Sequence, residues 1–236
     1  ACMKHVGVNV AADCFMNAAI TGVNGGMLVV AADDPGMHSS QNEQDSRCYA
    51  KFAMVPILEP SSQQECYDMA YSGFDLSEKY NVPVMLRITT RIAHSRAGVT
   101  PREIKPEREM SLPKNPTQFV LLPAIARKNY KILLATQEDL EKASEESPWN
   151  KYFDGVDKSK GIIACGIAYN YFRENFPEDT CPYPVIKVSQ YPLPRKMINK
   201  LAAEVDEIIV LEDGYPVVEE LLKGYLEKEA VRGRLD

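Results

Sequence analysis

The chain has 236 residues, 45% of them hydrophobic and 25% charged, and a formal net charge of −6. This length is enough for one large or two modest domains, and the composition is that of an ordinary globular protein. The negative charge argues against nucleic acid or an anionic membrane surface as a partner, and no apolar run approaches the roughly 20 residues that span a bilayer.

Six cysteines are scattered along the chain without a CxxC pair. Zinc sites and iron–sulfur clusters normally use clustered thiolates, so the pattern predicts no metal site in this chain. Dispersed cysteines on apolar elements indicate free core thiols in a reducing compartment, here the cytoplasm. The N-terminus lacks the features of a signal peptide and enters structure at once, so we expect the chain to start inside a domain. The six are Cys2, Cys14, Cys48, Cys66, Cys165 and Cys181.

The first part of the chain alternates between predicted helices and strands. The run at 27–33 (MLVVAAD) is apolar on both faces, as a buried parallel strand is. We expect a helix at 11–21 before it and a helix at 42–53 after it. A capping box of Ser40 and Glu43 opens the second helix.

The alternation continues with a predicted strand at 55–58, a long helix and a strand at 82–89. A second capping box, Ser62 and Glu65, opens that helix, which runs to about residue 80. Strands that alternate with helices predict a parallel sheet covered on both faces. The helix residues expected to face its core are Met69, Gly73, Phe74 and Leu76.

Residues 97–118 break the pattern. They contain four prolines and many charges without apolar periodicity, which is typical of a linker along the surface. A second, smaller α/β unit then begins with a long helical pattern at 123–146. The sequence thus predicts an α/β fold of two domains with parallel sheets, at 1–96 and 119–236. In the second domain, strands are expected at 161–165, 184–188 and 207–211, and helices at 167–175, 195–205 and 215–230.

The three histidines are all expected at strand ends of the first domain. His38 follows the strand at 27–33, His94 follows the strand at 82–89, and His5 lies where a strand truncated at its start would end. Ligands of open parallel sheets bind beyond the carboxyl ends of the strands, so the three side chains are expected on one edge. This grouping fits a polar site and fits three structural histidines equally well. A three-histidine zinc site is disfavoured because each histidine comes from a different loop.

The loop after the strand at 27–33 is rich in groups that bind polar ligands. Part of it has local roles, in a turn, in helix capping by Ser40 and at the strand end with Asp34. The remaining hydroxyl, amide and imidazole groups precede a helix and are suited to a carboxylate or another anionic ligand. These unexplained residues are His38, Ser39, Gln41, Asn42 and Gln44.

Two other loops carry similar groups. Lys4, His5 and Asn9 combine a cation, an imidazole and an amide before a helix. Arg91 and a second arginine flank His94, and guanidinium groups bind carboxylates or phosphates through two hydrogen bonds. The alternatives are an ordinary strand–helix connection for the first loop and surface charge at a domain exit for the second.

Signals in the second domain are weaker. Cys165 and Gly166 follow a strand as a nucleotide-binding turn does, but one glycine is not the GxGxxG pattern. Glu212 and Asp213 end another strand, where two acids indicate either a solvated strand end or a functional pair.

Three runs together resemble the alpha subunit of the indolepyruvate:ferredoxin oxidoreductases, within the thiamine-diphosphate-dependent 2-oxoacid:ferredoxin oxidoreductase family. They are MKHVGVNVAAD at 3–13, ADDPGMHSSQNEQDSR at 32–47 and VPVMLRITTRIAHSR at 82–96. The second run is long and specific. The resemblance continues to the C-terminus, where residues 161–220 resemble the transketolase C-terminal-like domain of that subunit. Residues 1–96 would then be the later part of a truncated pyrimidine-binding-type domain.

The resemblance implies the activity of a larger parent subunit. Enzymes of this family cleave aryl 2-oxoacids at a thiamine ylid, pass two electrons through iron–sulfur clusters to ferredoxin and make an acyl-CoA. The implied cofactors of the parent are thiamine diphosphate with magnesium, and iron–sulfur clusters. The implied partners are the missing domains, a beta subunit, ferredoxin, the 2-oxoacid and CoA, with a homodimer as an open alternative.

The chain also departs from the family pattern. The family's glutamate that protonates the aminopyrimidine belongs to a segment N-terminal to Lys4, whereas the first glutamate here is Glu43, in another motif. The diphosphate- and magnesium-binding domain and the ferredoxin-like cysteine clusters are also missing from the sequence. We therefore expect an internal fragment that binds no cofactor tightly and does not turn over alone, and we assign no catalytic residue.

The resulting hypothesis is an enzyme fragment whose loops line a cofactor–substrate cleft that a missing domain completes. The alternative is a non-catalytic scaffold or assembly module of a 2-oxoacid oxidoreductase complex. The residues predicted to line the cleft are Lys4, His5, Asn9, Asp34, His38, Ser39, Ser40, Gln41, Asn42, Arg91 and His94.

Overall fold

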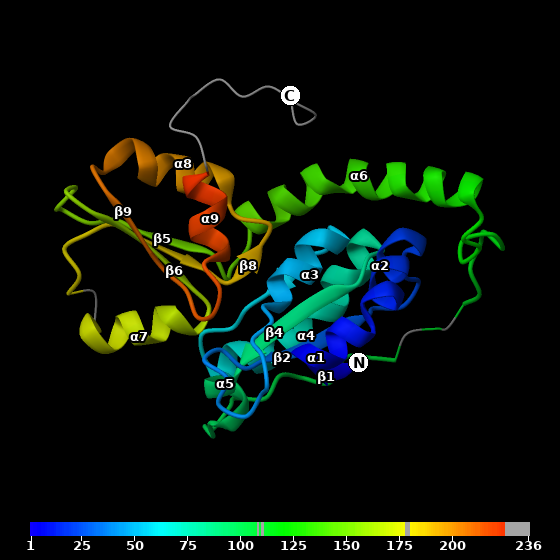
Figure 1. Ribbon diagram of the computed structural model, residues 1–236, viewed down its shortest axis with the longest axis horizontal. Helices are drawn as coiled ribbons and strands as arrows, with labels where there is room; N and C mark the ends of the chain where they lie inside the picture. The colour runs from blue at the N-terminus through cyan, green and yellow to red at the C-terminus, as the bar shows by residue number, and fades with distance from the viewer. Residues whose placement is uncertain (108, 110, 178–179, 225–236) are drawn as a thin grey trace.

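The computed structural model describes residues 1–107, 109, 111–177 and 180–224 and shows an α/β fold with two sheets (Figure 1). The strands of the first sheet are β1 (Cys2–Lys4), β2 (Leu28–Asp33), β3 (Ile57–Leu58), β4 (Val84–Thr89) and β8 (Gln190–Tyr191). Their order is β1-β2-β4-β3-β8, and the first four are parallel. β8 comes from late in the chain and pairs antiparallel with β3, so the second half contributes to the first sheet.

Helices cover both faces of the first sheet because its strands are apolar on both sides. Val29 and Ala31 of β2 share a core with α1, α2 and α3, whereas Leu28 and Val30 pack in the core of α4 on the opposite face. Burial on both faces is the usual state of a parallel sheet. The helices of this half are α1 (His5–Val10), α2 (Ala12–Thr21), α3 (Ser46–Ala53), α4 (Gln63–Tyr80) and α5 (Thr90–His94).

The second sheet has the order β5-β7-β6-β9. Its strands are β5 (Lys151–Phe153), β6 (Gly161–Cys165), β7 (Val185–Val188) and β9 (Ile208–Leu211), of which β5 alone runs antiparallel to its neighbour in the described part of this sheet. The helices are α7 (Ile167–Asn175), α8 (Arg195–Glu204) and α9 (Val217–Lys223). Figure 1 shows α7 on one face of this sheet and α8 and α9 on the other.

The long helix α6 (Pro123–Glu145) connects the two halves and packs against both α2 and α8 (Figure 1). Leu133 of α6 belongs to one apolar cluster that includes Phe15 of the first half and Ile163 of the second. The halves therefore share a core. Among the residues that the structure describes, none of the helices combines the length and the apolarity needed to cross a membrane.

The predicted fold class, α/β with two parallel-sheet domains, is confirmed. β6 and α7 begin and end where the sequence places them, and Ser62 caps α4 by accepting a hydrogen bond from the backbone N–H of Glu65 at 3.2 Å. The domain boundaries at 96 and 118 stay a prediction. The predicted linker at 97–118 contains no helix or strand in its described positions. It lies along α4, where Arg102 Nε is 2.5 Å from Asp68 Oδ1.

The capping box predicted from Ser40 and Glu43 is wrong. α3 starts later, and its N-cap is Asp45, whose carboxylate accepts a hydrogen bond from the backbone N–H of Arg47 at 3.0 Å. The side chains of Ser40 and Glu43 make their hydrogen bonds within the preceding loop. The loop is longer than predicted because its polar groups fold back on the end of β2 instead of starting a helix.

Two predictions about the core are also wrong. Phe74 is 45% exposed, while its neighbour Gly73 packs so closely that a Cβ there would lie 2.8 Å from Leu28. Successive residues of a helix point about 100° apart, so the two positions do not share the sheet-facing side. All six cysteines are free, but three of them are exposed rather than in the core. The exposed cysteines are Cys2, Cys14 and Cys48.

The remaining differences concern short elements and chain ends. Patterns of only two to six residues carry too little periodicity to be predicted, which is why α1, β5 and β8 were missed. The helix predicted at 215–230 appears as α9, which begins after Pro216 because proline lacks the N–H of a helix interior. Its predicted continuation at 225–230 lies outside the described residues.

Candidate functional site

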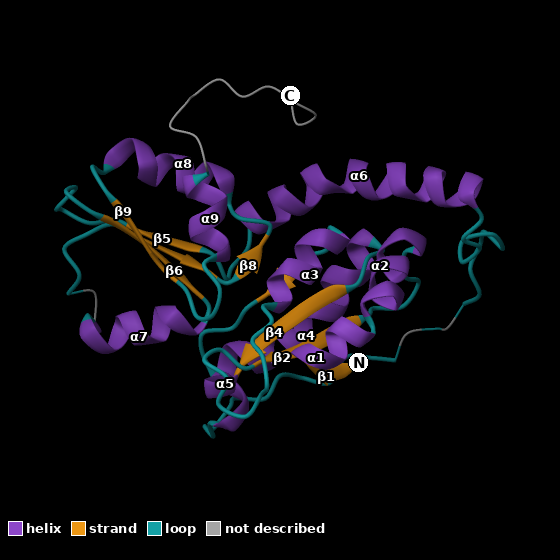
Figure 2. Ribbon diagram, in the orientation of Figure 1, coloured by secondary structure: helices purple, strands orange, loops and turns teal. Residues whose placement is uncertain are grey.

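Three parallel strands end at one edge of the first sheet, and a polar segment follows each of them. His5 directly follows β1, Asp34 follows β2 and Thr90 follows β4. In the register of the sheet, Lys4 of β1 lies beside Ala32 of β2, so these two strands end close to each other. Figure 2 shows β4 pointing toward α5 and the loops that gather there. The structure thus places the three predicted segments side by side. Two of them were wrongly predicted as loops, because residues 5–10 form α1 and residues 90–94 form α5.

The carboxylate of Asp34 organises the loop that follows β2. It accepts hydrogen bonds from the backbone N–H groups of Ser39 at 2.9 Å and His38 at 3.1 Å. It also accepts hydrogen bonds from the hydroxyls of Ser40 at 2.6 Å and Thr90 at 2.7 Å. These donors, Ser40 first, stabilise the charged form and hold the pKa of this carboxyl far below its ordinary value of 3.8. The loop is therefore wrapped around a carboxylate that is charged at neutral pH.

Two side chains from the first segment reach this loop. The ammonium of Lys4 donates to the carbonyl oxygen and to the hydroxyl of Ser39, both at 3.3 Å. The amide of Asn9 donates to Gln44 Oε1 at 3.0 Å, and the Gln44 amide donates to Asn42 Oδ1 at 3.0 Å. A cation and several amides therefore join the loop in one continuous polar surface.

His5 differs from the rest of the edge because it is fully buried. It is the first residue of α1, and its exposed fraction is 0%. Neither ring nitrogen has a hydrogen-bond partner within the described structure. Buried polar groups are nearly always paired, and leaving one unpaired costs about 1–3 kcal/mol. The imidazole is therefore a donor and acceptor that the described residues leave without a partner, and the side chains that cover it must move before a ligand reaches it.

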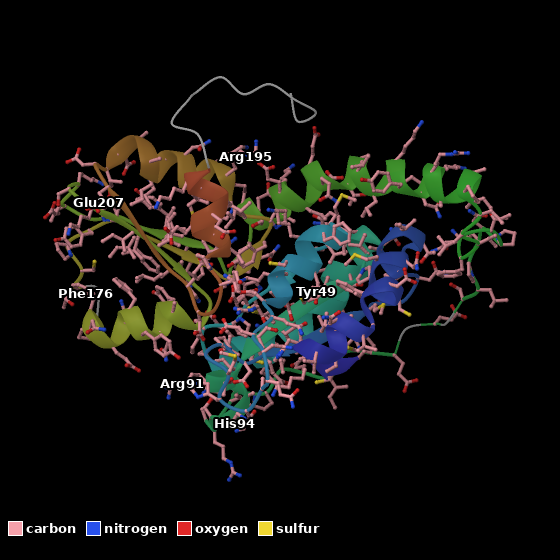
Figure 3. All side chains as sticks on the ribbon, in the orientation of Figure 1. Tyr49, Arg91, His94, Phe176, Arg195 and Glu207 are labelled. Atoms are coloured by element: carbon pink, nitrogen blue, oxygen red, sulfur yellow. The ribbon has the colours of Figure 1, made fainter. Side chains whose placement is uncertain are left out.

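Four other predicted residues face solvent at this end of the molecule: His38, Gln41, Arg91 and His94. Figure 3 shows Arg91 and His94 projecting from α5. Arg91 lies near Tyr171 of α7, in the second half of the chain. Burial raises the pKa of the Tyr171 phenol, and the nearby guanidinium of Arg91 acts in the opposite direction. The edge therefore does not gather the histidines into one cluster. Across the described residues, no group of three or more His, Cys, Asp or Glu side chains is arranged to hold a metal ion.

A buried ion-pair cluster directly beneath this edge was not predicted. Arg87 of β4 is 1% exposed, and its Nε donates to Asp33 Oδ2 at 2.7 Å. Its other nitrogens donate to Asp45 Oδ2 at 3.3 Å and to Glu59. Arg47 joins the cluster through Asp45, to which its Nε donates at 2.9 Å. The signal in the sequence was an arginine inside the apolar run VMLRIT, because arginine is almost never fully buried unless paired.

Comparison with known proteins finds relatives along most of the chain. The family model described as "Pyruvate flavodoxin/ferredoxin oxidoreductase, thiamine diP-bdg" matches residues 29–144. The indolepyruvate oxidoreductase subunit IorA of Archaeoglobus fulgidus is 45% identical over 223 residues, which are 93% of this chain and 36% of that protein. The subunit of the same name from Methanothermobacter marburgensis is 40% identical over 241 residues, which are 99% of this chain and 39% of that protein. The chain spans somewhat more than a third of the length of these relatives.

A solved structure shares the fold. It is the 2-oxoglutarate:ferredoxin oxidoreductase from Magnetococcus marinus with 2-oxoglutarate, coenzyme A and succinyl-CoA bound, and its TM-score to this chain is 0.67. The alignment covers 94% of this chain and 47% of that chain at 14% sequence identity. At this identity the likeness concerns the arrangement of helices and strands alone.

Proposed function

Because this chain belongs to the family of the indolepyruvate oxidoreductase IorA subunits, we propose that it forms part of a thiamine-diphosphate-dependent 2-oxoacid oxidoreductase. The polar edge of the first sheet would be one wall of its cofactor–substrate cleft. The observation that carries this assignment is the buried imidazole of His5, which has no partner in the described part of the chain and lies at the carboxyl edge of a parallel sheet, where ligands of such sheets bind.

The substrate we propose is indolepyruvate or a related aryl 2-oxoacid. Oxidative decarboxylation breaks the bond between the carboxylate and the 2-oxo carbon and releases CO2. The 2-oxo carbon then forms a thioester with the thiol of CoA, two electrons pass through iron–sulfur clusters to ferredoxin, and one proton is released. The products are an acyl-CoA and reduced ferredoxin.

Thiamine diphosphate, when bound, supplies the carbon nucleophile and the electron sink of this reaction. The residues present fit a polar cofactor or substrate at the edge, since the described residues leave both ring nitrogens of His5 without a partner. The side chain of Lys4 is 38% exposed, and its ammonium lies 3.6 Å from Asp34 Oδ2. Lys4 would hold a carboxylate by charge, and Ser39 and Asn9 would orient it by hydrogen bonds. The described residues include no group that we assign as the catalytic acid or base.

We expect magnesium, the iron–sulfur clusters, a beta subunit and ferredoxin to be contributed by, or to bind to, other parts of a complex in the cytoplasm. A homodimer is a further arrangement that the family suggests. The isolated 236-residue chain is expected to bind no cofactor tightly and to be inactive.

The test is His5→Leu in the complete protein assembled with its partners. Leucine fills the buried site without a polar group, so the melting temperature should not fall, while kcat/KM for indolepyruvate should drop at least about tenfold because a polar contact to cofactor or substrate is lost. Ser189→Ala is the matched control. The Ser189 hydroxyl is also buried without a partner within the described structure, but it lies in the second half of the chain.

His38→Ala provides a second, exposed variant of the same site and is expected to lower kcat/KM without changing stability. Unchanged kcat/KM in both His5→Leu and His38→Ala would overturn the assignment of the cleft. An assembled complex that binds its partners but shows no turnover with any 2-oxoacid would support the scaffold alternative instead.

A further inference from the structure

One guanidinium holds both ends of the loop at 34–45. Asp33, immediately before the loop, accepts a hydrogen bond from Arg87 Nε at 2.7 Å. Asp45, at the end of the loop, lies 3.3 Å from Arg87 Nη2. The Arg87 side chain is 0% exposed, so water does not compete for these contacts. The guanidinium is planar and its donors are fixed in one fork, so it sets the spacing of the two loop ends.

The same guanidinium also contacts the second half of the chain. Arg87 Nη2 donates to the backbone oxygen of Asp213 at 2.8 Å, in the connection between β9 and α9. Arg47 makes two contacts to this connection, from Nη1 to Glu212 Oε2 at 2.8 Å and from Nη2 to the backbone oxygen of Tyr215 at 2.8 Å. The connection at 212–216 is therefore an integral part of the buried ion-pair cluster.

The close approach of this connection depends on Gly214. Its φ is +105°, a conformation that residues with a side chain rarely adopt. A Cβ at this position would lie 3.0 Å from Arg87 Nη2 and 3.1 Å from Asp45 Oδ2. A larger residue would push the connection away from the two groups that define the end of the loop.

We propose that Arg87 is a positioning residue through which the β9–α9 connection sets the geometry of the 34–45 loop. The inference rests on the proposed function only in taking that loop as a wall of the cleft, since the coupling itself follows from contacts within the chain. The path is continuous. It runs from Asp213 to Arg87, from Arg87 to Asp33, and along the backbone to Asp34, whose carboxylate holds the amides of His38 and Ser39.

The test uses Gly214→Ala in the complete protein, with Gly224→Ala as the matched control. Gly224 also has a positive φ, +62°, but a Cβ there would meet none of the described residues within 4 Å. Amide hydrogen exchange at His38 and Ser39 reports the loop directly, because both amides donate to Asp34. We expect exchange to accelerate at least about tenfold in Gly214→Ala and to stay within about twofold in Gly224→Ala.

Kinetics supply the second readout. A loop that is misplaced but still present should weaken substrate binding more than turnover, so KM for the 2-oxoacid is expected to rise about fivefold or more in Gly214→Ala with a smaller change in kcat. A residue with a purely structural role would instead lower the amount of folded enzyme and leave KM unchanged.

Glu212→Gln is the second variant if Gly214→Ala does not fold. It keeps the shape of the side chain and removes the charge that faces Arg47, and the same shifts in exchange and KM are expected. Exchange and KM at the level of Gly224→Ala in the folded variants would overturn the coupling. The coupling stands independently if exchange accelerates while His5→Leu and His38→Ala leave kcat/KM unchanged, a result that would count against the proposed function alone.

Discussion

The carboxyl edges of the parallel strands in the two sheets differ in how far other parts of the chain cover them. At the first edge, polar side chains such as His38 and His94 face solvent, and the buried imidazole of His5 has no partner among the described residues. At the second edge, the turn at Cys165 and Gly166 is buried against the first half, and a Cβ on Gly166 would lie 2.5 Å from Glu59 Cγ. Burial there raises the pKa of the Cys165 thiol well above its ordinary value. A ligand has room at a strand edge only where no neighbouring element covers that edge.

The acids at the second edge are paired within the chain. Glu212 is neither a solvated strand end nor a free acid, because its carboxylate accepts hydrogen bonds from Arg47 at 2.8 Å and from the backbone N–H of Val218 at 3.1 Å. The turn at Cys165 and Gly166 leaves no space for a nucleotide, because it is buried against Glu59. The first edge therefore carries exposed polar side chains such as His38 and His94, whereas the polar groups of the second edge are used in packing.

The largest expected effect comes from Arg87→Met, which removes the group that joins the two edges. It leaves the buried carboxylates of Asp33, Asp45 and Glu59 without their shared partner, and such a loss costs about 3–5 kcal/mol in the free energy of unfolding. Urea denaturation measures this. Arg102→Met, whose arginine is 45% exposed in its pair with Asp68, is the control and should leave the midpoint nearly unchanged. Equal midpoints for both variants would show that the cluster does not hold the halves together.

A smaller effect is expected from Tyr191→Phe, which removes one contact between the halves. The Tyr191 hydroxyl of β8 donates to Glu59 Oε2 at 2.7 Å in a fully buried position, and hydrogen bonds to charged groups contribute about 1.5–3 kcal/mol. Burial also raises the pKa of this phenol, so it stays a donor at neutral pH. Thermal unfolding of Tyr191→Phe should therefore begin at lower temperature. Tyr130→Phe, at a position 42% exposed, serves as the control and should match the parent protein.

A local effect at the first edge is expected from the titration of Asp34. Its pKa is lowered in the folded state, so the stabilisation of the loop is complete above the ordinary value of 3.8 and is lost as the pH falls through the lower folded value. Amide signals of His38 and Ser39 followed by NMR should stay constant from pH 7 down to about 4 and shift only below that range. In Asp34→Asn the acid transition should disappear. A transition centred above pH 4 would contradict the hydrogen-bond arrangement.

The smallest effects are expected from His38→Asn and His94→Asn. Both side chains are exposed at the first edge, so each change should alter the free energy of unfolding by no more than about 0.5 kcal/mol. Chemical denaturation of the two variants tests whether this edge carries polar groups that folding does not use. A loss above about 1 kcal/mol would assign these histidines a structural role and remove the contrast between the edges.

Several features followed from the sequence because they depend on neighbours along the chain. The apolar run of β2, the cap at Ser62 and the alternation of strands with helices predicted the parallel architecture. The rule that ligands bind at carboxyl ends of parallel strands predicted which loops would meet. The structure places Lys4, Asp34 and Thr90 together at that edge, and Thr90 alone among these three was not predicted.

Local reasoning failed where a polar group finds its partner in space. Ser40 and Glu43 match a capping box by spacing, but the carboxylate of Asp34 and the backbone N–H of Gly36 take their hydrogen bonds instead. The sequence does not distinguish a cap from a loop contact when both partners are close along the chain. His5 shows the opposite case, because nothing local predicts that an imidazole beside Lys4 is buried and finds no partner among the residues that the structure describes.

The sequence by itself determined the α/β class, the polar edge and the family, since periodicity, strand ends and motifs are read from consecutive residues. The tertiary structure alone decided which charges are buried and which edge stays accessible. Arg87 is stable inside β4 because its partners arrive from 54, 42 and 28 residues away, at Asp33, Asp45 and Glu59. Its fourth contact, the backbone oxygen of Asp213, comes from 126 residues away. Burial of a charge is a property of the assembled neighbourhood, and that neighbourhood exists only after both sheets have packed.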